Sequence, residues 1–213
     1  SIADPFQPPL QPDQPLEWRG AAVTAKKTIN AADSRGNIYQ LELRKDPTPH
    51  LAAKSEGNLP KPIRSRIAVA GNLLCCVDVD NVLHTLDAET LAPIAQIKLA
   101  APASLGPVAA DGFCFVAAGD DELVCVNREG QEAWRHPLKG LSVTGRPLVK
   151  GEVVHFVTTN GLLRTLRMSD GSEVGTLDAE IPLSGGPIAA ADTLVLIGDD
   201  GSLNVVKTPA AAP

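Results

Sequence analysis

The chain has few aromatic side chains, no excess of positive charge and no long apolar run. Phe, Trp and Tyr make up 3% of its 213 residues, which is low for a domain that recognises sugars or bases by stacking. A net charge of −6 and a pI near 5.2 argue against nucleic acid, because binding would need a basic face to displace counterions from phosphates. No run of eighteen apolar residues occurs, so we expect no helix that spans a membrane.

The sequence also lacks the patterns of metal sites and of common catalytic centres. It contains no Cys-x-x-Cys pair, and its four histidines lie far apart in sequence, so no zinc pattern is present. The stretch 78–83 begins like a calcium loop but fails at the later ligand positions. There is no Gly-x-Ser-x-Gly nucleophile elbow and no Gly-rich phosphate loop. We therefore expect no catalytic residue, no metal site and no cofactor.

Four cysteines occur, at Cys75, Cys76, Cys114 and Cys125. Neighbours in one strand, such as the first two, point to opposite faces. If residues 120–121 form a hairpin turn, Cys125 pairs with Val116 and lies diagonal to Cys114, roughly 7–8 Å away, which is beyond easy bridging. We expect four buried thiols that pack as small hydrophobic side chains.

Five stretches share one pattern, and it is clearest where a glycine is followed closely by proline, small apolar residues and a turn. The three clearest copies begin at Gly106, Gly145 and Gly186, so they lie 39 and 41 residues apart. A period near forty with strand-like content is typical of sheets repeated around an axis. The repeats run nearly end to end, so we expect one domain over residues 17–207.

The clearest unit spans residues 106–140 and contains four short strands joined by tight turns. We expect strands at 106–110, 113–118, 123–127 and 131–138, with Gly, Asp or Asn in each turn. The middle strands are apolar without alternation, so both of their faces must be covered. No amphipathic helix stands between the strands, which excludes a βαβ protein. Short antiparallel sheets that each pack between two others meet this demand.

The two ends of the chain complete the predicted architecture. Residues 1–16 are rich in proline and predict an extended arm, and residues 208–213 predict a disordered tail. The last unit has three strands, and residues 14–20 resemble the fourth strand at 131–136. We therefore expect an all-β fold of about five four-stranded antiparallel sheets, closed by the N-terminal segment pairing with the last sheet. Because the chain starts at Ser1 without Met or an apolar signal region, we expect a piece of a longer protein.

These units resemble the repeat of the PQQ-like β-propellers, a family that includes the quinoprotein alcohol dehydrogenases and an outer-membrane assembly lipoprotein. The best stretches are Gly106–Trp134 and Gly145–Gly175. The resemblance implies a propeller of four-stranded blades, in which a fourth-strand Trp ties neighbouring blades together. Trp134 matches that position, and we expect Trp18 to match it as well.

The same resemblance offers a catalytic interpretation, which the residues do not favour. A quinoprotein enzyme of this family holds its cofactor over an aromatic floor, beside a Ca²⁺-bound carboxylate and often a vicinal disulfide. Cys75 and Cys76 are adjacent, but they fall inside an apolar strand, and only Trp18 and Trp134 could supply the floor. Most members of the family are not enzymes, so the resemblance implies a non-catalytic protein.

Charged residues in the turns and connections are the candidate binding residues. Equivalent turns should lie on one side of the ring, together with the connections between sheets, and form a mixed-charge docking surface. The alternative is that Asp stands in these turns because its side chain bonds the turn backbone, and that the loops are merely solvated. The candidate binding residues are Arg35, Arg64, Arg66, Asp80, Asp120, Asp121, Arg146, Asp199 and Asp200.

The sequence therefore predicts a non-catalytic platform that docks a protein partner through loops on one side of a β-propeller. We expect it to be a monomer as an isolated domain, a module of a larger exported protein, and periplasmic or at the cell surface. Two alternatives remain: a divergent PQQ-dependent dehydrogenase fragment, and a propeller that binds a small molecule or glycan in its central channel.

Overall fold

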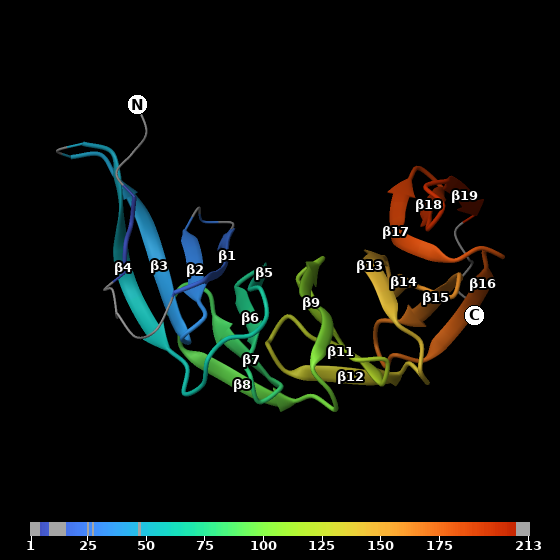
Figure 1. Cartoon of the computed structure of the whole chain (residues 1–213), viewed down its shortest axis with the longest axis horizontal. Helices are drawn as coiled ribbons and strands as arrows, with labels where there is room; N and C mark the ends of the chain where they lie inside the picture. The colour runs from blue at the N-terminus through green and yellow to red at the C-terminus, as the bar shows by residue number, and fades with distance from the viewer. Residues whose placement is uncertain (1–4, 9–15, 25, 27, 47, 208–213) are drawn as a thin grey trace. The chain divides into compact units, whose positions relative to one another are not determined.

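The computed structural model describes residues 5–8, 16–24, 26, 28–46 and 48–207. Within these ranges the chain is all-β: nineteen strands form five separate antiparallel sheets, and no residue is helical (Figure 1). Consequently, the described ranges contain no helix that could cross a membrane. In each sheet the strands follow one another in chain order, as expected when short hairpin turns join neighbours.

The chain divides into two compact units, made of residues 1–98 with 128–131, and of residues 99–127 with 132–213. Two four-stranded sheets belong to the first unit: β1 Trp18–Val23, β2 Ile29–Asp33, β3 Asn37–Arg44 and β4 His50–Asn58; then β5 Ala68–Ala70, β6 Leu73–Val77, β7 Val82–Asp87 and β8 Pro93–Lys98. Three sheets belong to the second: β9 Ala103–Ala110, β10 Phe113–Ala118, β11 Glu122–Val126 and β12 Glu132–Pro137; β13 Val143–Lys150, β14 Val153–Thr158, β15 Leu162–Arg167 and β16 Glu173–Asp178; and β17 Leu183–Ala190, β18 Thr193–Gly198 and β19 Leu203–Lys207.

The last four sheets repeat at a constant interval of forty residues. The pair Leu83↔Val77 in the second sheet recurs as Leu123↔Ala117 and Leu163↔Val157 in the next two, and as Leu203↔Ile197 in the last. Successive residues of a strand alternate between its faces. Every repeat therefore presents the same positions to the same face of its sheet.

Apolar clusters fill the space between sheets within each unit. In the first unit, Ile38 of β3 packs with Leu74 and Leu86 of the second sheet. In the second unit, Leu163 of β15 packs with Leu194 of β18. In the second unit, the middle strands β14 and β15 are buried on both faces because their sheet packs between two others, which is why their sequences do not alternate.

The first sheet departs from the sequence-based expectation. The sheet has the four strands expected of a unit, with β4 as its fourth, and β1 begins at Trp18, which pairs with Asp33 of β2. Trp18 therefore belongs to the first sheet, whereas the expectation placed residues 14–20 beside the last one. The last sheet has three strands among the described residues; residues 9–15 and 208–213 lie outside them.

All four cysteines are free and fully buried, as the sequence predicts. The register differs by one residue from the expectation, because Cys125 pairs with Phe115 and Cys114 pairs with Val126. The two thiols thus lie on opposite faces of their sheet. Burial raises the pKa of the Cys125 thiol to about 12, and burial next to Cys75 and Asp78 raises that of Cys76.

We expect none of the four thiols to react with a thiol reagent in the native protein. The thiolate is the reactive form, and burial disfavours it at Cys76 and Cys125. All four cysteines are 0% exposed, so a reagent has no access to them. Time-resolved labelling with Ellman's reagent should show no fast phase in native buffer, and all four thiols should react once guanidinium unfolds the chain. Fast labelling of any thiol in the native state would contradict the described packing.

Candidate functional site

The connection between β4 and β5 carries three cationic residues that are exposed. We call residues 60–66 the basic loop. Its cationic side chains, Lys61, Arg64 and Arg66, belong to exposed residues, and Ile63 between them is fully buried. The buried side chain anchors the loop, while the three cations face solvent.

Backbone hydrogen bonds hold the basic loop against the neighbouring turn. The N–H groups of Arg64 and Ser65 both donate to the carbonyl oxygen of Val77, at 2.9 and 3.1 Å. The N–H of Val79 donates to the carbonyl of Pro62 at 3.0 Å, and Ile63 forms a bridge with Asp78. A loop whose polar backbone is paired in this way has few alternative conformations.

Side chains add a second set of bonds. Nε of Arg19, in β1, donates to the carbonyl of Ile63 at 2.9 Å. Oγ of Ser65 accepts from the N–H of Val77 at 2.8 Å and donates to the carbonyl of Arg66 at 2.6 Å. The loop is thus fixed on two sides, by β1 and by the end of β6. Fixing it before a partner arrives reduces the entropy that binding would cost.

The turn between β6 and β7 is itself held by a buried carboxylate. Oδ1 of Asp78 accepts from the N–H groups of Asp80 and Val82, both at 2.9 Å. Its Oδ2 lies 2.8 Å from Nε2 of His84, which is also buried. Burial acts to raise the pKa of Asp78, but the hydrogen bonds from His84, Val82 and Asp80 outweigh it and hold the pKa below its ordinary value.

Asp33 has the same role in the turn between β2 and β3. It accepts from the N–H groups of Arg35 and Asn37 and from the hydroxyl of Tyr39. Burial acts to raise its pKa, and the hydrogen bonds led by Asn37 lower it further than burial raises it. Asp33 and Asp78 therefore serve the turn backbone, the structural role foreseen as the alternative to ligand binding.

The charges around the basic loop differ in how far they are neutralised. Nη2 of Arg35 lies 3.4 Å from the fully buried Oδ2 of Asp33, so Arg35 serves the turn. Nζ of Lys61 lies 3.2 Å from Oδ2 of Asp80, with both side chains about half exposed, where an ion pair contributes little. Arg64 and Arg66 form no ion pair among the described residues. These two cations are the part of the loop most available to a partner.

The turns of the second unit carry the acidic candidates. Asp120, Asp121, Asp199 and Asp200 are all exposed. Oδ1 of Asp120 accepts from the hydroxyl of Ser142, and Oδ1 of Asp200 accepts from the N–H of Ser202 at 2.9 Å. These two carboxylates support their own loops. The turn at Asp199 adjoins the connection between β16 and β17, because the N–H of Asp199 donates to the carbonyl of Pro182 at 3.0 Å.

Arg146 lies away from the turns, contrary to expectation. It belongs to β13, and its Nη2 donates to the carbonyl of Ala109 in β9 at 3.2 Å. The sequence interpretation placed it in a connection between sheets. The structure instead shows an irregular stretch inside the strand, where the register shifts between Thr144 and Leu148.

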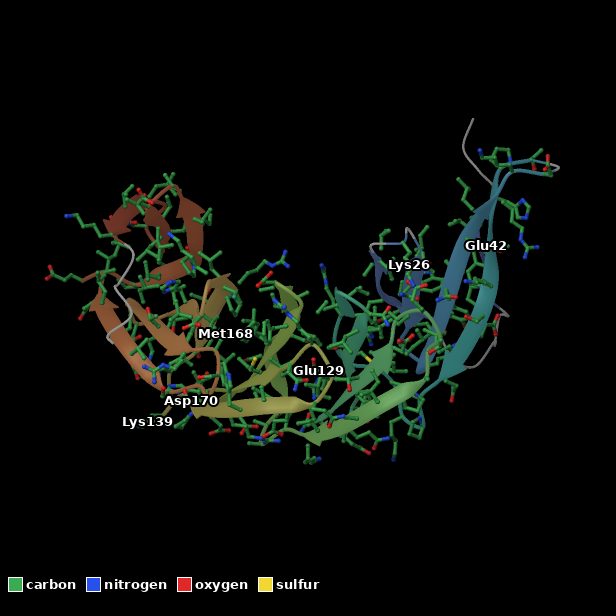
Figure 2. All side chains as sticks on the ribbon, turned by 180° about the vertical axis from the view of Figure 1, so that it is seen from behind. Lys26, Glu42, Glu129, Lys139, Met168 and Asp170 are labelled. Atoms are coloured by element: carbon green, nitrogen blue, oxygen red, sulfur yellow. The ribbon has the colours of Figure 1, made fainter. Side chains whose placement is uncertain are left out.

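The residues that fix the basic loop were not among the sequence-based candidates. Arg19, Ile63 and Ser65 hold it, and each looks unremarkable in sequence. The one available signal was Ile63, an isolated apolar residue within a charged connection. In the described part of the chain, no group of three or more His, Cys, Asp or Glu side chains could hold a metal ion. The charged residues labelled in Figure 2, which are Lys26, Glu42, Glu129, Lys139 and Asp170, all lie outside the basic loop.

Comparison with known proteins gives one match at the level of a family and one curated relative. A model of PQQ-like repeats described as outer membrane protein assembly factor BamB matches residues 52–174 and 92–208. The chain is 27% identical over 158 residues to outer membrane protein assembly factor BamB of Yersinia pestis. This alignment covers 66% of the chain and 40% of the relative, so the chain spans less than half of that protein's length.

Two solved structures share the fold at low identity. The computationally designed Ika8 protein is 14% identical, with a TM-score of 0.59 over 85% of this chain and 55% of its own. BBS1N, solved in complex with ARL6DN, is 16% identical, with a TM-score of 0.61 over 97% of this chain and 68% of its own. Together, the five sheets and a family model whose two matches span residues 52–208 show that the chain belongs to the PQQ-like β-propeller repeat family described as outer membrane protein assembly factor BamB.

Proposed function

We propose that this protein is a non-catalytic platform that docks an acidic segment of a protein partner on the basic loop. The observation that supports the proposal is that residues 60–66 combine a fixed backbone with exposed cationic side chains. Their backbone is fixed by Arg19, Val77 and Val79, while the Arg64 and Arg66 side chains are exposed and form no ion pair among the described residues. A rigid loop with free cations is suited to steer and hold a negatively charged surface.

The relatives support a role in protein assembly. The relative from Yersinia pestis is named an outer membrane protein assembly factor, and an assembly factor acts on other proteins. We extend this role to the present chain, together with a periplasmic or cell-surface location. The partner we infer is a protein, bound by charge and shape at the loop side of the first unit.

The buried cysteines weigh against the quinoprotein alternative. Cys75 and Cys76 are free thiols inside β6, with no exposed surface. They therefore cannot serve as the vicinal disulfide that the catalytic interpretation would place beside a cofactor. Trp134 is likewise occupied, since its Nε1 donates to the carbonyl of Met168 at 2.9 Å.

The proposal is tested by capture from an extract of the source cells with the purified chain immobilised. The wild type captures its partner through the positive charges at positions 64 and 66. The double variant Arg64→Glu/Arg66→Glu should capture at least about tenfold less of the same proteins, because these charges then repel an acidic partner. Capture should also weaken as salt is added, since exposed charges are screened. The matched control is Lys45→Glu/Lys54→Glu, which makes the same charge change at exposed cations of the first sheet.

Equal loss in both double variants would show that net charge alone governs capture and would overturn the role of the basic loop. Undiminished capture by Arg64→Glu/Arg66→Glu would overturn it as well. Circular dichroism should be unchanged in both variants, because all four side chains belong to exposed residues.

A further inference from the structure

The second unit encloses two histidines, one in each of its contacts between sheets. His136 of β12 is 8% exposed, and His155 of β14 is 0% exposed. The imidazole of His136 packs edge-on against the ring of Phe156 in the next sheet, at 6.4 Å between ring centroids. Val157 packs with Leu194 of the last sheet, and His155 faces the same way because it stands two residues earlier in the same strand. Both imidazoles therefore lie between sheets.

The repeat shows that neither position needs a histidine for the sheets to pack. Equivalent residues are identified by their partners in the adjacent strand, which lie forty residues apart. The equivalents are Cys75, Phe115 and Val195 for His155, and Ile97 and Leu177 for His136. All five are apolar. A titratable side chain in the contact between sheets is therefore a property of these two positions and not of the fold.

Each imidazole is hydrogen-bonded through one ring nitrogen. Nδ1 of His136 lies 3.0 Å from the carbonyl oxygen of Gly171, and Nδ1 of His155 lies 2.9 Å from Oγ1 of Thr165. Nε2 of both rings is buried and forms no hydrogen bond within the described part of the chain. A neutral imidazole has one N–H donor, whereas the charged form has two. Charging either ring would therefore bury an N–H without an acceptor, which is costly.

The charged groups around His136 come from β15, β16 and the connection after β12. Arg164 of β15 is 7% exposed, and its Nε lies 3.2 Å from Oε1 of Glu173 in β16. Burial lowers the pKa of His136 below its ordinary value of 6.5, while the hydrogen bond to Gly171 acts against it. The cations of Arg164 and Lys139 also lower the pKa, and the carboxylate of Glu173 raises it. Their combined effect favours the neutral ring.

His155 has an apolar environment on the side of the last sheet. The side chains that pack in this contact include Leu194 and Leu196 of β18. Its partner in β13 is Leu148. Burial lowers the pKa of His155, and the cation of Lys150 in β13 acts in the same direction. A positive charge on this ring would be placed among apolar side chains, which is unfavourable.

We propose that the second unit is an acid-sensitive element, in which protonation of His136 and His155 weakens both contacts of the β13–β16 sheet with its neighbours. The unfolded chain takes up these two protons near the ordinary histidine pKa of about 6.5, and the folded chain takes them up only at lower pH. Stability is therefore full above about 6.5 and is lost as the pH falls below this value. The proposal does not rest on the docking function, because the basic loop belongs to the first unit.

Urea denaturation between about pH 7.5 and about pH 5.5 tests the proposal. In a Trp18→Phe background, Trp134 is the remaining tryptophan, so its fluorescence reports the second unit. The unfolding constant should rise by up to about tenfold for each histidine, because about pH 5.5 lies one unit below the ordinary pKa. His136→Leu/His155→Val introduces side chains that other repeats carry at these positions. It should abolish this rise, whatever its stability at neutral pH.

The matched control is His50→Gln, at a partly exposed histidine of the first sheet, which should leave the rise unchanged. Carboxyl groups with lowered pKa values, such as Asp78 and Glu173, titrate below this range of pH and do not contribute. An unfolding constant that does not change with pH in the wild type would overturn the proposal, and so would a rise that persists in His136→Leu/His155→Val.

Proton NMR of the imidazole Cε1–H signals provides a second test, which needs no substitution in the contacts. In the folded wild type, the signals of His136 and His155 should keep their neutral positions down to below about pH 5.5, because both rings resist charging. The single variants His136→Leu and His155→Val assign the two signals. Titration of both rings near the ordinary value of about 6.5 would overturn the proposal.

Discussion

Trp134→Ala is expected to lower the free energy of unfolding of the second unit by about 3–5 kcal/mol. Trp134 lies in β12 and is 6% exposed. Its ring packs 6.1 Å from that of Phe115, and its Nε1 bonds the carbonyl of Met168 in the turn between β15 and β16. Removing it opens a cavity between two sheets and leaves the partly buried Met168 carbonyl without its donor.

The turn between β15 and β16 has a glycine, Gly171, where the Trp134 ring packs against it. Gly171 has φ +70°, and a Cβ at this position would lie 2.6 Å from Cδ2 of Trp134. The carbonyl of Gly171 also lies 3.0 Å from Nδ1 of His136, in the same strand as Trp134. Two side chains of β12 therefore bind one turn of the following sheet. The family resemblance implied this role for a fourth-strand Trp, which ties neighbouring blades together.

Urea denaturation followed by circular dichroism measures the effect of Trp134→Ala. Gly171→Ala should also destabilise, by about 2 kcal/mol or more, through both strain at positive φ and contact with the indole. The matched control is Trp18→Ala, at the only other tryptophan, which is 45% exposed and should cost about 1 kcal/mol. Equal effects of the two Trp substitutions would contradict the role of Trp134 as an anchor between sheets.

Asp78→Ala is expected to destabilise the first unit by about 3 kcal/mol. The substitution leaves two backbone N–H groups and the buried His84 without their acceptor, and an unsatisfied buried group costs about 1–3 kcal/mol. Asp78 also forms the bridge to Ile63. Its loss should therefore loosen the basic loop and weaken partner capture more than the exposed charge variants of the first sheet do.

The loss of stability caused by Asp78→Ala should become smaller as the pH falls. The pKa of Asp78 is lower in the folded chain than its ordinary value of 3.8. Its carboxylate therefore stabilises the fold above that value, and the contribution is lost as the pH falls through the folded pKa. The stability difference between wild type and Asp78→Ala should be full at neutral pH and shrink in acid below 3.8.

Chemical denaturation at several pH values measures both parts of this prediction. Asp80→Asn is the control, because Asp80 stands two residues along the same turn but is exposed, and should change stability by about 0.5 kcal/mol or less. A difference between wild type and Asp78→Ala that persists or grows in acid would show that the carboxylate does not hold the turn.

Where apolar pattern and turn residues agree, the sequence predicted the fold closely. The expected strand at 113–118 is β10 as observed, because Phe113–Ala118 is apolar throughout and Asp111-Gly112 precedes it. The pattern failed at β4, His50–Asn58, whose Ala, Lys, Ser and Glu residues have little intrinsic preference for strands. Pairing with β3 imposes that strand, and pairing between segments is not visible in local composition.

The candidate site was predictable in its charges but not in its geometry. Arg64 and Arg66 could be chosen because they stand in a connection. The sequence could not show that Arg35 serves Asp33, or that Arg146 lies inside β13. These outcomes depend on strand register and on buried hydrogen bonds, where a shift of one residue turns a side chain to the other face. The one-residue difference at Cys125 has the same cause.

The central claim is that a partner meets the chain at the basic loop. Site-specific photocrosslinking tests it most directly, with p-benzoylphenylalanine placed at Arg64 and, as a reference, at Lys54 on the first sheet. We predict that the probe at position 64 gives one discrete cross-linked protein in the source cells, whereas the probe at position 54 gives none. A cross-link from position 54 with none from position 64 would contradict the account.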